Sequence, residues 1–216
     1  MAATTTRVDL HLSLDAEADA LLSKDALALL IGMVLDQQIQ LEKAFKGPRD
    51  LLPRLGVKKL TATQIATWNT EAFITAFCTP PALHRYPAAM AVRVQALCQV
   101  LVDEYGGRAD TLWTTAATGK DLVKRIKALP GFGEQKAKIF TALLGKQLGV
   151  RPEGWREAAG VYGEVGSHRS VADITGPESL LKVRAFKQQM KAAARNEAPT
   201  KAPKAPKIAK ATAKKG

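Results

Sequence analysis

The amino-acid sequence predicts an all-α protein. Apolar residues recur every three or four positions along most of the chain, which places them on one face of a helix. The alternation of apolar and polar residues that marks a half-buried strand is missing from the sequence. The chain has 216 residues, of which 46% are hydrophobic, so it can bury the core of one large or two small domains.

The first long helix is predicted over residues 25–46, in "DALALLIGMVLDQQIQLEKAFK". Its apolar stripe runs through positions 27, 30, 31, 34, 41 and 45. Gly47 followed by Pro48 is expected to end this helix. The earlier segment "TRVDLHLSL" is expected to be extended.

Further helices are predicted along the rest of the chain. Two short ones lie in "VKKLTATQIATWN" and "TEAFITAFC", with Thr61 as the N-cap that accepts a hydrogen bond from Gln64. A longer helix begins near Pro87 and stops at Gly106 and Gly107. The segments "TGKDLVKRIKAL" and "EQKAKIFTALLGKQLG" form two more, one on each side of a "PGFG" turn.

Positive charge is concentrated at the C-terminal end. The formal net charge is +12, and residues 191–216 supply +7 of it, from seven lysines and Arg195 against the single acid Glu197. This segment repeats Lys-Ala-Pro and has almost no large apolar residues. We therefore expect a folded domain over 1–190 and a disordered basic tail over 191–216. Such a tail suits a polyanion, nucleic acid above all, and a purely solubilising role is the alternative.

The composition argues against several classes of protein. The mean hydropathy is −0.09 and no apolar run approaches twenty residues, so we expect no contact with a membrane. The N-terminus lacks the apolar core of a secretory signal. Cys78 and Cys98 are too few for a disulfide framework or for a four-cysteine iron–sulfur or zinc site. The sequence therefore predicts a soluble cytoplasmic protein without a metal cluster.

The stretch "LPGFGEQKAKIF", residues 129–140, interrupts the helical pattern and resumes it at once. Pro130 is expected to stop the first helix, and the two glycines to allow the positive-φ turns of an abrupt reversal. The turn should leave the backbone N–H groups of residues 131–135 free at the start of the next helix, where a phosphate can bind. Lys136 and Lys138 add positive charge behind these amides.

"LPGFGEQKA" resembles the hairpin of the helix-hairpin-helix DNA glycosylases, the superfamily that includes endonuclease III. "LIGMVLDQQIQLEKA", residues 30–44, resembles the early helix of the same proteins, which contains a Gln-Gln or Ala-Gln pair. The resemblance covers roughly residues 20–165. It implies an all-α, glycosylase-like helical bundle that acts as a monomer on double-stranded DNA in the bacterial nucleoid. The iron–sulfur cluster of many relatives has no cysteines to hold it here, and a monovalent cation at the hairpin is compatible with the resemblance.

The resemblance also implies a set of residues that contact DNA. In these proteins the glutamine at the position of Gln38 is inserted into the duplex, where it fills the space left by an extruded base. Gln38 lies on the apolar stripe of the predicted helix, and the alternative is a core glutamine with satisfied hydrogen bonds. The whole set expected at DNA comprises Gln38, Leu129, Gly131, Phe132, Gly133, Gln135, Lys136 and Lys138.

The position of the family's lysine nucleophile is occupied by glutamine. Bifunctional members use that lysine to form a Schiff base with the sugar, and this chain has Gln135 there. Lys136 follows, turned about 100° around the helix axis, and is expected to face the backbone or solvent. The sequence therefore predicts a glycosylase without AP lyase activity.

Superfamily members also use an aspartate eighteen residues beyond that lysine position, and the same count from Gln135 reaches Glu153. A carboxylate there would stabilise the cationic sugar or activate water. Glu153 has one more methylene than aspartate and lacks the family's surrounding residues. Asp36 and Asp173 are therefore kept as alternative catalytic residues.

Two functions remain from the sequence. The first is a monofunctional DNA glycosylase that hydrolyses the N-glycosidic bond of a damaged or mismatched base in base excision repair. The alternative is a non-catalytic helix-hairpin-helix DNA-binding protein that has lost the active-site carboxylate. Release of a free base distinguishes them, whereas DNA affinity does not.

Overall fold

The computed structural model of the chain describes residues 9–197. In this range the chain forms eleven α-helices and two short 3₁₀ turns, and it contains no strand. The predicted all-α class is therefore confirmed. The N-terminal helices are α1 (Ala16–Lys24), α2 (Ala26–Leu35), α3 (Leu41–Leu55), α4 (Ala62–Ala66), α5 (Thr70–Cys78) and α6 (Pro87–Tyr105).

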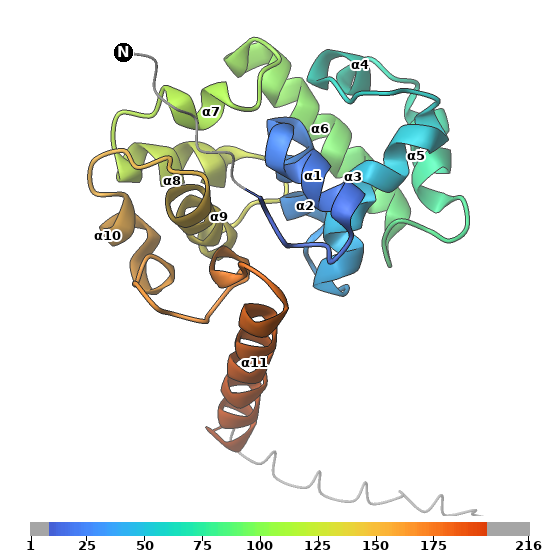
Figure 1. The fold of residues 1–216 in the computed structure, drawn as a ribbon. Helices are drawn as coiled ribbons and strands as arrows, with labels where there is room; N and C mark the ends of the chain where they lie inside the picture. Colours follow the sequence, from blue (N-terminus) through green and yellow to red (C-terminus); the bar gives the residue numbers. More distant parts are fainter. Residues whose placement is uncertain (1–8, 198–216) are drawn as a thin grey trace, which may run out of the picture.

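The remaining elements form a second group of helices, which lies beside the first (Figure 1). In this group α8 packs against α9, and α10 packs against both. A single hydrophobic core joins the two groups. The elements of the second group are α7 (Thr111–Thr114), α8 (Gly119–Ala128), α9 (Glu134–Gln147), α10 (Trp155–Ala159), η1 (Gly160–Tyr162), η2 (Val171–Asp173) and α11 (Pro177–Glu197).

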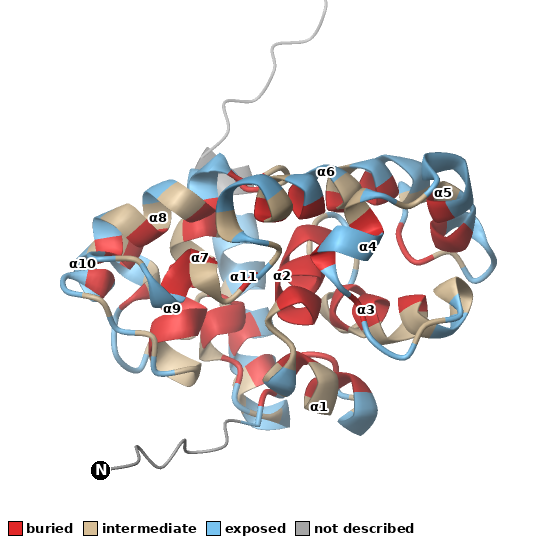
Figure 2. Ribbon diagram, turned by 90° about the horizontal axis from the view of Figure 1, so that it is seen from above, coloured by how far each residue is buried: buried red, intermediate tan, exposed pale blue. Residues whose placement is uncertain are grey.

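Helix α2 forms the centre of the core. Nine of its ten residues, from Leu27 to Leu35, are buried, and Figure 2 shows the helix in the middle of the molecule. The Asp25 carboxylate begins the helix, because it accepts hydrogen bonds from the N–H groups of Leu27 and Ala28. A helix that is apolar all round can be stable only when it is covered on every side, and α1, α3 and α6 pack against this one.

The single helix predicted over residues 25–46 is wrong. The chain leaves the helix at Asp36 and begins α3 only at Leu41. Gly47 and Pro48 do not end a helix either, because α3 passes through both of them. A Cβ atom on Gly47 would lie 2.5 Å from the Cδ1 atom of Leu35, so the glycine allows α3 to pack closely on α2. A residue pattern that normally ends helices serves here for packing.

Other predicted boundaries are confirmed. The Thr61 hydroxyl accepts a hydrogen bond from the Gln64 N–H at 3.2 Å and caps α4. Helix α6 begins at Pro87 and ends at Gly106, which has a left-handed φ of 60°.

Helix α11 extends beyond the boundary predicted at residue 190. It continues to Glu197, so residues 191–197 are helical, and the disorder predicted for them is wrong. Lysine, alanine and glutamine favour helix, and this local preference continues past the last core contact. Figure 1 shows α11 extending away from the body. The rest of the predicted tail lies outside the described residues. Among residues 9–197, no helix is long and apolar enough to span a membrane.

Candidate nucleic-acid interface and adjoining cleft

A short turn reverses the chain between α8 and α9, at the position where the sequence predicts a hairpin. Helix α8 ends at Ala128, Leu129 becomes extended, and α9 begins at Glu134. Gly131 makes the reversal with a φ of 90°. A Cβ atom at this position would lie 2.7 Å from the Cδ atom of Arg93, so Gly131 also allows the hairpin to approach α6. The hairpin is thereby fixed against the N-terminal group of helices.

The second glycine of the hairpin has a different role from the predicted one. Gly133 has a φ of −97° and a ψ of 178°, which is extended backbone and not a positive-φ turn. The set of free amides is also smaller than predicted, because the Phe132 N–H donates to the Leu129 carbonyl at 3.1 Å. In the described part of the chain, the N–H groups of Gly133, Glu134 and Gln135 have no hydrogen-bond acceptor. Such amides at a helix N-terminus are suited to binding an anion.

The two glycines provide a matched test of the hairpin's backbone. Gly131→Ala should destabilise the protein by about 1–3 kcal/mol, because alanine is strained at positive φ and its Cβ meets Arg93. Gly133→Ala should change the free energy of unfolding by less than about 1 kcal/mol, since its φ is allowed and no atom lies within 4 Å of the added Cβ. Urea unfolding of both variants measures the difference. Equal stability would contradict this assignment of the turn.

Lysines flank the free amides, and one carboxylate reduces their effect. The Glu134 carboxylate lies 2.8 Å from the Lys127 ammonium and 2.9 Å from that of Lys138. Hydrogen bonds to these two lysines lower the pKa of Glu134 to about 2. Lys138 is therefore paired in the free protein, and its predicted role at DNA requires that a phosphate compete with Glu134.

Two residues predicted to contact DNA are buried. Leu129 is 2% exposed and Phe132 is 7% exposed. The Phe132 ring packs against the Phe140 ring at a centroid distance of 6.0 Å. Their side chains anchor the hairpin to the core, so a contact of these two residues with DNA would have to use backbone atoms.

The segment between α2 and α3, residues 36–40, presents the Gln-Gln pair. Gln38 is exposed and has a φ of 57°, which is rare for a residue other than glycine. It therefore does not lie on a helical stripe, and the alternative of a core glutamine is wrong. An exposed Gln38 agrees with the insertion into DNA that the resemblance implies. The prediction that Gln38 lies on a helix is wrong, because α2 ends at Leu35.

Gln37 holds this segment in place through three contacts. Its side-chain amide donates to the Val34 carbonyl at 2.6 Å, and the Arg93 guanidinium donates to its side-chain oxygen at 3.1 Å. The buried ring of His84 accepts the Tyr86 N–H on Nδ1 at 2.9 Å, so Nε2 is the protonated nitrogen and donates to the Gln37 carbonyl at 2.9 Å. Burial lowers the pKa of His84, which keeps the ring neutral. The hydrogen bonds that fix Gln37 thus explain why Gln38 keeps its strained conformation.

A cleft of about 650 Å³ opens between this segment, the start of α9 and helix α11. Its polar lining includes Asp36, Gln38 and Gln135, and the Gln135 amide donates to the Tyr162 hydroxyl at 2.8 Å. The cleft therefore brings together two segments that are about a hundred positions apart in the sequence. The apolar side chains in its lining are Met33, Ile39, Ile139, Val161, Phe186 and Met190.

Asp36 is the carboxylate in this cleft. Burial raises its pKa above the usual 3.8, although the charges of Lys187 and Lys136 act in the opposite direction. In the described residues its side chain has no hydrogen-bond donor and no ion pair within 4 Å. A desolvated carboxylate beside polar groups in a cleft is the arrangement expected of a functional group rather than of a structural one.

The predicted orientation of Lys136 is wrong. Its ammonium points into the cleft wall, where it donates to the carbonyls of Met33 at 2.9 Å and Val34 at 3.3 Å. These carbonyls belong to the last turn of α2, where C=O groups have no intrahelical N–H donor and the helix dipole favours a cation. Burial lowers the pKa of Lys136 to about 8, while the charge of Asp36 partly opposes the shift. Lys136 ties the hairpin helix to the 36–40 segment.

Glu153 does not line the cleft. Its side chain is exposed, and its backbone carbonyl accepts the Gly119 N–H at 2.7 Å. Gly119 begins α8, at the end opposite to the hairpin. The count of eighteen residues fails because α9 continues to Gln147, about 18 Å along the helix axis from Gln135. The chain therefore reaches Glu153 at the far end of the helix pair.

Asp173 is occupied by structural contacts. Its carboxylate accepts hydrogen bonds from the Lys146 ammonium at 2.5 Å, the Ser167 hydroxyl at 3.0 Å and the Arg169 N–H at 2.8 Å. It also forms a capping box with Ser170 at the start of η2. Only 3% of its side chain is exposed. Of the three candidate carboxylates, Asp36 alone faces the cleft.

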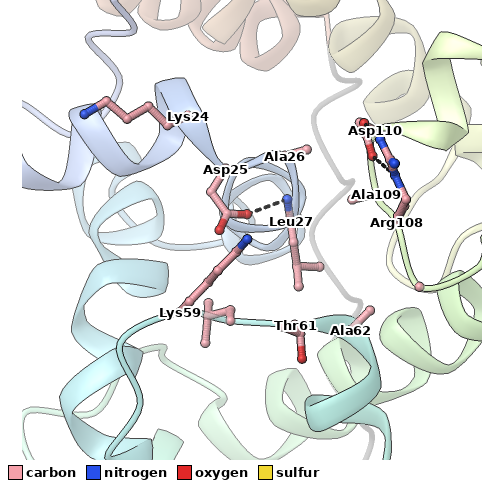
Figure 3. Close-up of a pocket in the computed structure, with 12 residues that line it drawn as sticks. Lys24, Asp25, Ala26, Leu27, Lys59, Thr61, Ala62, Arg108, Ala109 and Asp110 are labelled. Atoms are coloured by element: carbon pink, nitrogen blue, oxygen red, sulfur yellow. Dashed lines mark hydrogen bonds and ion pairs between the residues drawn. The ribbon is translucent and has the colours of Figure 1, made fainter.

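A second hollow, of about 430 Å³, lies near the start of α2 (Figure 3). Lys59 points toward Asp25 across this hollow, and Arg108 pairs with Asp110 at 2.7 Å. The Asp25 carboxylate already caps α2. Asp25 and Asp110 are thus both occupied by structural contacts, and no hairpin residue lines this hollow. We therefore place the candidate site at the first cleft.

The part of the chain that the structure describes contains no group of three or more His, Cys, Asp or Glu residues arranged to hold a metal ion. Cys78 is exposed and Cys98 is buried in the core. Burial raises the pKa of the Cys98 thiol to about 12, as expected for an inert core thiol.

Several cleft residues are not in the set that the sequence predicts at DNA. Tyr162 follows α10 in a 3₁₀ turn, and Arg169 precedes η2. Phe186, Lys187 and Met190 lie on α11. Their spacing of one, three and four positions is that of one helical face, so a search for the face of α11 could have found them. Nothing local indicates that this face meets residues 36–40.

Comparison of the chain with protein-family models, curated proteins and solved structures found no match.

Proposed function

We propose that this protein is a monofunctional DNA glycosylase of the helix-hairpin-helix type. The hairpin binds the DNA backbone, Gln38 enters the duplex, and the cleft receives an extruded nucleotide whose glycosidic bond is hydrolysed beside Asp36. The observation that supports this proposal most is a desolvated carboxylate two residues before an exposed glutamine, in the same cleft as the hairpin helix.

The start of α9 supports the binding of a phosphate. Three neighbouring amides without acceptors point from a helix N-terminus, whose dipole favours an anion. Lys127 and Lys138 stand on both sides. The formal charge of +12 adds a long-range attraction for DNA.

The conformation of Gln38 supports a wedge into the duplex. An enzyme that acts on a base must take it out of the stack, and the vacated space has to be filled. A positive φ stores strain in a residue other than glycine, and such strain is maintained where the surroundings impose a required geometry. Gln37 and His84 supply these surroundings by hydrogen bonding. The Gln38 side chain is left exposed at the rim of the cleft.

The environment of Asp36 supports its role in the chemistry. A carboxylate in a partly dry cleft interacts strongly with positive charge that develops on the sugar, and it can accept a proton from the attacking water. Glu153 lacks this environment, because it is exposed and outside the cleft. We therefore assign the catalytic role to Asp36, the first of the two alternatives.

One observation favours the alternative of a non-catalytic DNA-binding protein. The position that matches the family's aspartate, Glu153, contributes no carboxylate to the cleft. If Asp36 does not replace it, the hairpin and Gln38 would still bind and distort DNA.

A panel of lesion-bearing duplexes tests the proposed activity. Purified protein should leave abasic sites that become nicks only after hot alkali. Borohydride should trap no covalent complex, because Gln135 cannot form an imine and the Lys136 ammonium donates to two carbonyls. Binding without abasic sites across the panel would favour the non-catalytic alternative. A trapped complex would show that Lys136 leaves its carbonyls and reaches the sugar.

The role of the hairpin amides is tested by two substitutions at one position. Gly133→Pro removes the N–H and shifts φ from −97° toward the proline value of about −65°, whereas Gly133→Ala keeps the N–H. The proline variant should lose tenfold or more in affinity for duplex DNA, which corresponds to about 1.4 kcal/mol. The alanine variant should bind as the wild type does. Equal binding by two folded variants would show that the amides do not hold phosphate.

A further inference from the structure

The cleft has more positive than negative charge in its lining. Lys136, Lys187 and Arg169 line it, and Asp36 is its single acid. Arg169 is 3.5 Å from the Glu164 carboxylate, so its charge is partly balanced. Within the described residues, neither Lys136 nor Lys187 has a carboxylate within 4 Å. The charges of both lysines act on the one carboxylate in the cleft, although the Lys136 ammonium itself donates to carbonyls in the cleft wall.

These lysines come from two different elements. Lys136 lies on α9, and hydrogen bonds to the carbonyls at the end of α2 fix the position of its ammonium. Lys187 is exposed on α11, in the same helical face as Phe186 and Met190. Both charges act on Asp36. A nucleotide that entered the cleft would therefore meet the Asp36 carboxylate and the Lys136 ammonium near the end of α2, and the Lys187 side chain from α11.

The charge of a base decides what its departure requires. When the C1′–N bond breaks, both electrons stay on the nitrogen. A neutral base consequently leaves as an anion, and nearby cations stabilise it as its charge develops. A base with a positive charge before the reaction, such as 7-methylguanine, leaves as a neutral molecule. Cations give no such help to it and oppose its entry into the cleft.

We propose that the cleft is selective for neutral bases that leave as anions, and that Lys187 and Lys136 stabilise the departing base. This inference rests on the proposed glycosylase activity and names the substrate class of the same site. In the full step, water adds its oxygen to C1′ and gives one proton to the Asp36 carboxylate. The C1′–N bond breaks with both electrons on the nitrogen, and the departing base anion takes up the proton from Asp36, which restores the carboxylate.

The first test compares two groups of lesions under single-turnover conditions with saturating protein. The neutral group contains uracil, hypoxanthine, 8-oxoguanine and thymine opposite guanine, and the cationic group is represented by 7-methylguanine. We expect release of at least one neutral base and a rate for 7-methylguanine at least tenfold lower. Faster release of 7-methylguanine would overturn this inference and leave the glycosylase activity standing. Release of no base at all would overturn both.

The second test uses substitutions on α11. Lys187→Met removes one cleft cation, and Lys191→Met removes a cation one turn further along the same helix, outside the cleft. We expect Lys187→Met to lower the ratio of neutral-base release to 7-methylguanine release by tenfold or more, and Lys191→Met to leave that ratio unchanged. An equal loss for both groups of lesions would show that Lys187 binds phosphate, and it would overturn the inference.

Discussion

Asp36→Asn should lower the rate of base release by a factor of about 10² or more, the range that acid–base and electrostatic catalysis supplies. Asparagine keeps the size of the side chain and removes its charge. Removal of a negative charge should not weaken the affinity for intact duplex. Single-turnover release with saturating protein measures the effect independently of binding. A rate near that of the wild type would remove Asp36 from the mechanism.

The same substitution should stabilise the folded protein at neutral pH. Burial raises the pKa of Asp36 above its unfolded value of 3.8, so the folded state binds the proton more tightly. The stability that comes from the protonated form is fully present below pH 3.8 and is lost as the pH rises through the raised pKa. Asparagine resembles the protonated form at every pH. The melting temperature of Asp36→Asn should therefore exceed that of the wild type at pH 7 but not at acidic pH.

Glu153→Gln is the matched control for both effects. The Glu153 side chain is exposed, and the contact with Gly119 uses only its backbone carbonyl. Release and melting temperature should therefore remain near the wild-type values. A loss of about 10² in release with this variant, together with an active Asp36→Asn, would reverse the assignment of the two carboxylates.

Asp173→Ala should cost about 3–5 kcal/mol of stability, the range for breaking one partner of a buried pair. The substitution leaves the Lys146 ammonium, 16% exposed, without its carboxylate. It also leaves the N–H groups of Arg169 and Ser170 without the acceptor of their capping box. Urea unfolding measures the loss.

Asp110→Ala is the comparison for Asp173→Ala. It breaks the exposed pair with Arg108 and should change stability by less than about 1 kcal/mol. A loss of under about 1 kcal/mol for Asp173→Ala as well would show that the contacts around Asp173 do not hold the 163–175 segment in place.

Features that depend on neighbouring residues could be predicted from the sequence. The hairpin between α8 and α9 follows from Pro130 and Gly131, because proline ends a helix and a φ of 90° requires glycine. The Thr61 cap and the end of α6 at Gly106 are equally local. The all-α class could also be predicted, because apolar residues recur every three or four positions within each segment.

The break after α2 could not be predicted in the same way. The stripe through residues 27–45 continues in register across residues 36–40, so its period gives no sign of an interruption. The break is held by His84 and Arg93, which bind Gln37 from positions about fifty residues away. Likewise, the period of a helix gives the angle of Lys136 about α9, but the acceptors at the end of α2 decide where its ammonium lies.

The candidate catalytic carboxylate could not be found by counting residues from the hairpin, because Glu153 lies outside the cleft. The count from Gln135 to Glu153 assumes that the chain returns to the hairpin, while α9 carries it to the far end of the helix pair. Asp36 is far from Gln135 in sequence and lies in the same cleft. The tertiary fold brings them together, with the Lys136 side chain of α9 bonded to the carbonyls at the end of α2.

The most direct measurement of the central claim needs no knowledge of the damaged base. It compares the affinities for two duplexes, one with a cationic pyrrolidine and one with a neutral tetrahydrofuran in place of a nucleoside. A site that stabilises the cationic sugar of the transition state should bind the pyrrolidine duplex at least about 10²-fold more tightly. Asp36→Asn should abolish this preference, and Glu153→Gln should keep it. Equal affinity of the wild type for the two duplexes, or a preference that persists in Asp36→Asn, would contradict the account.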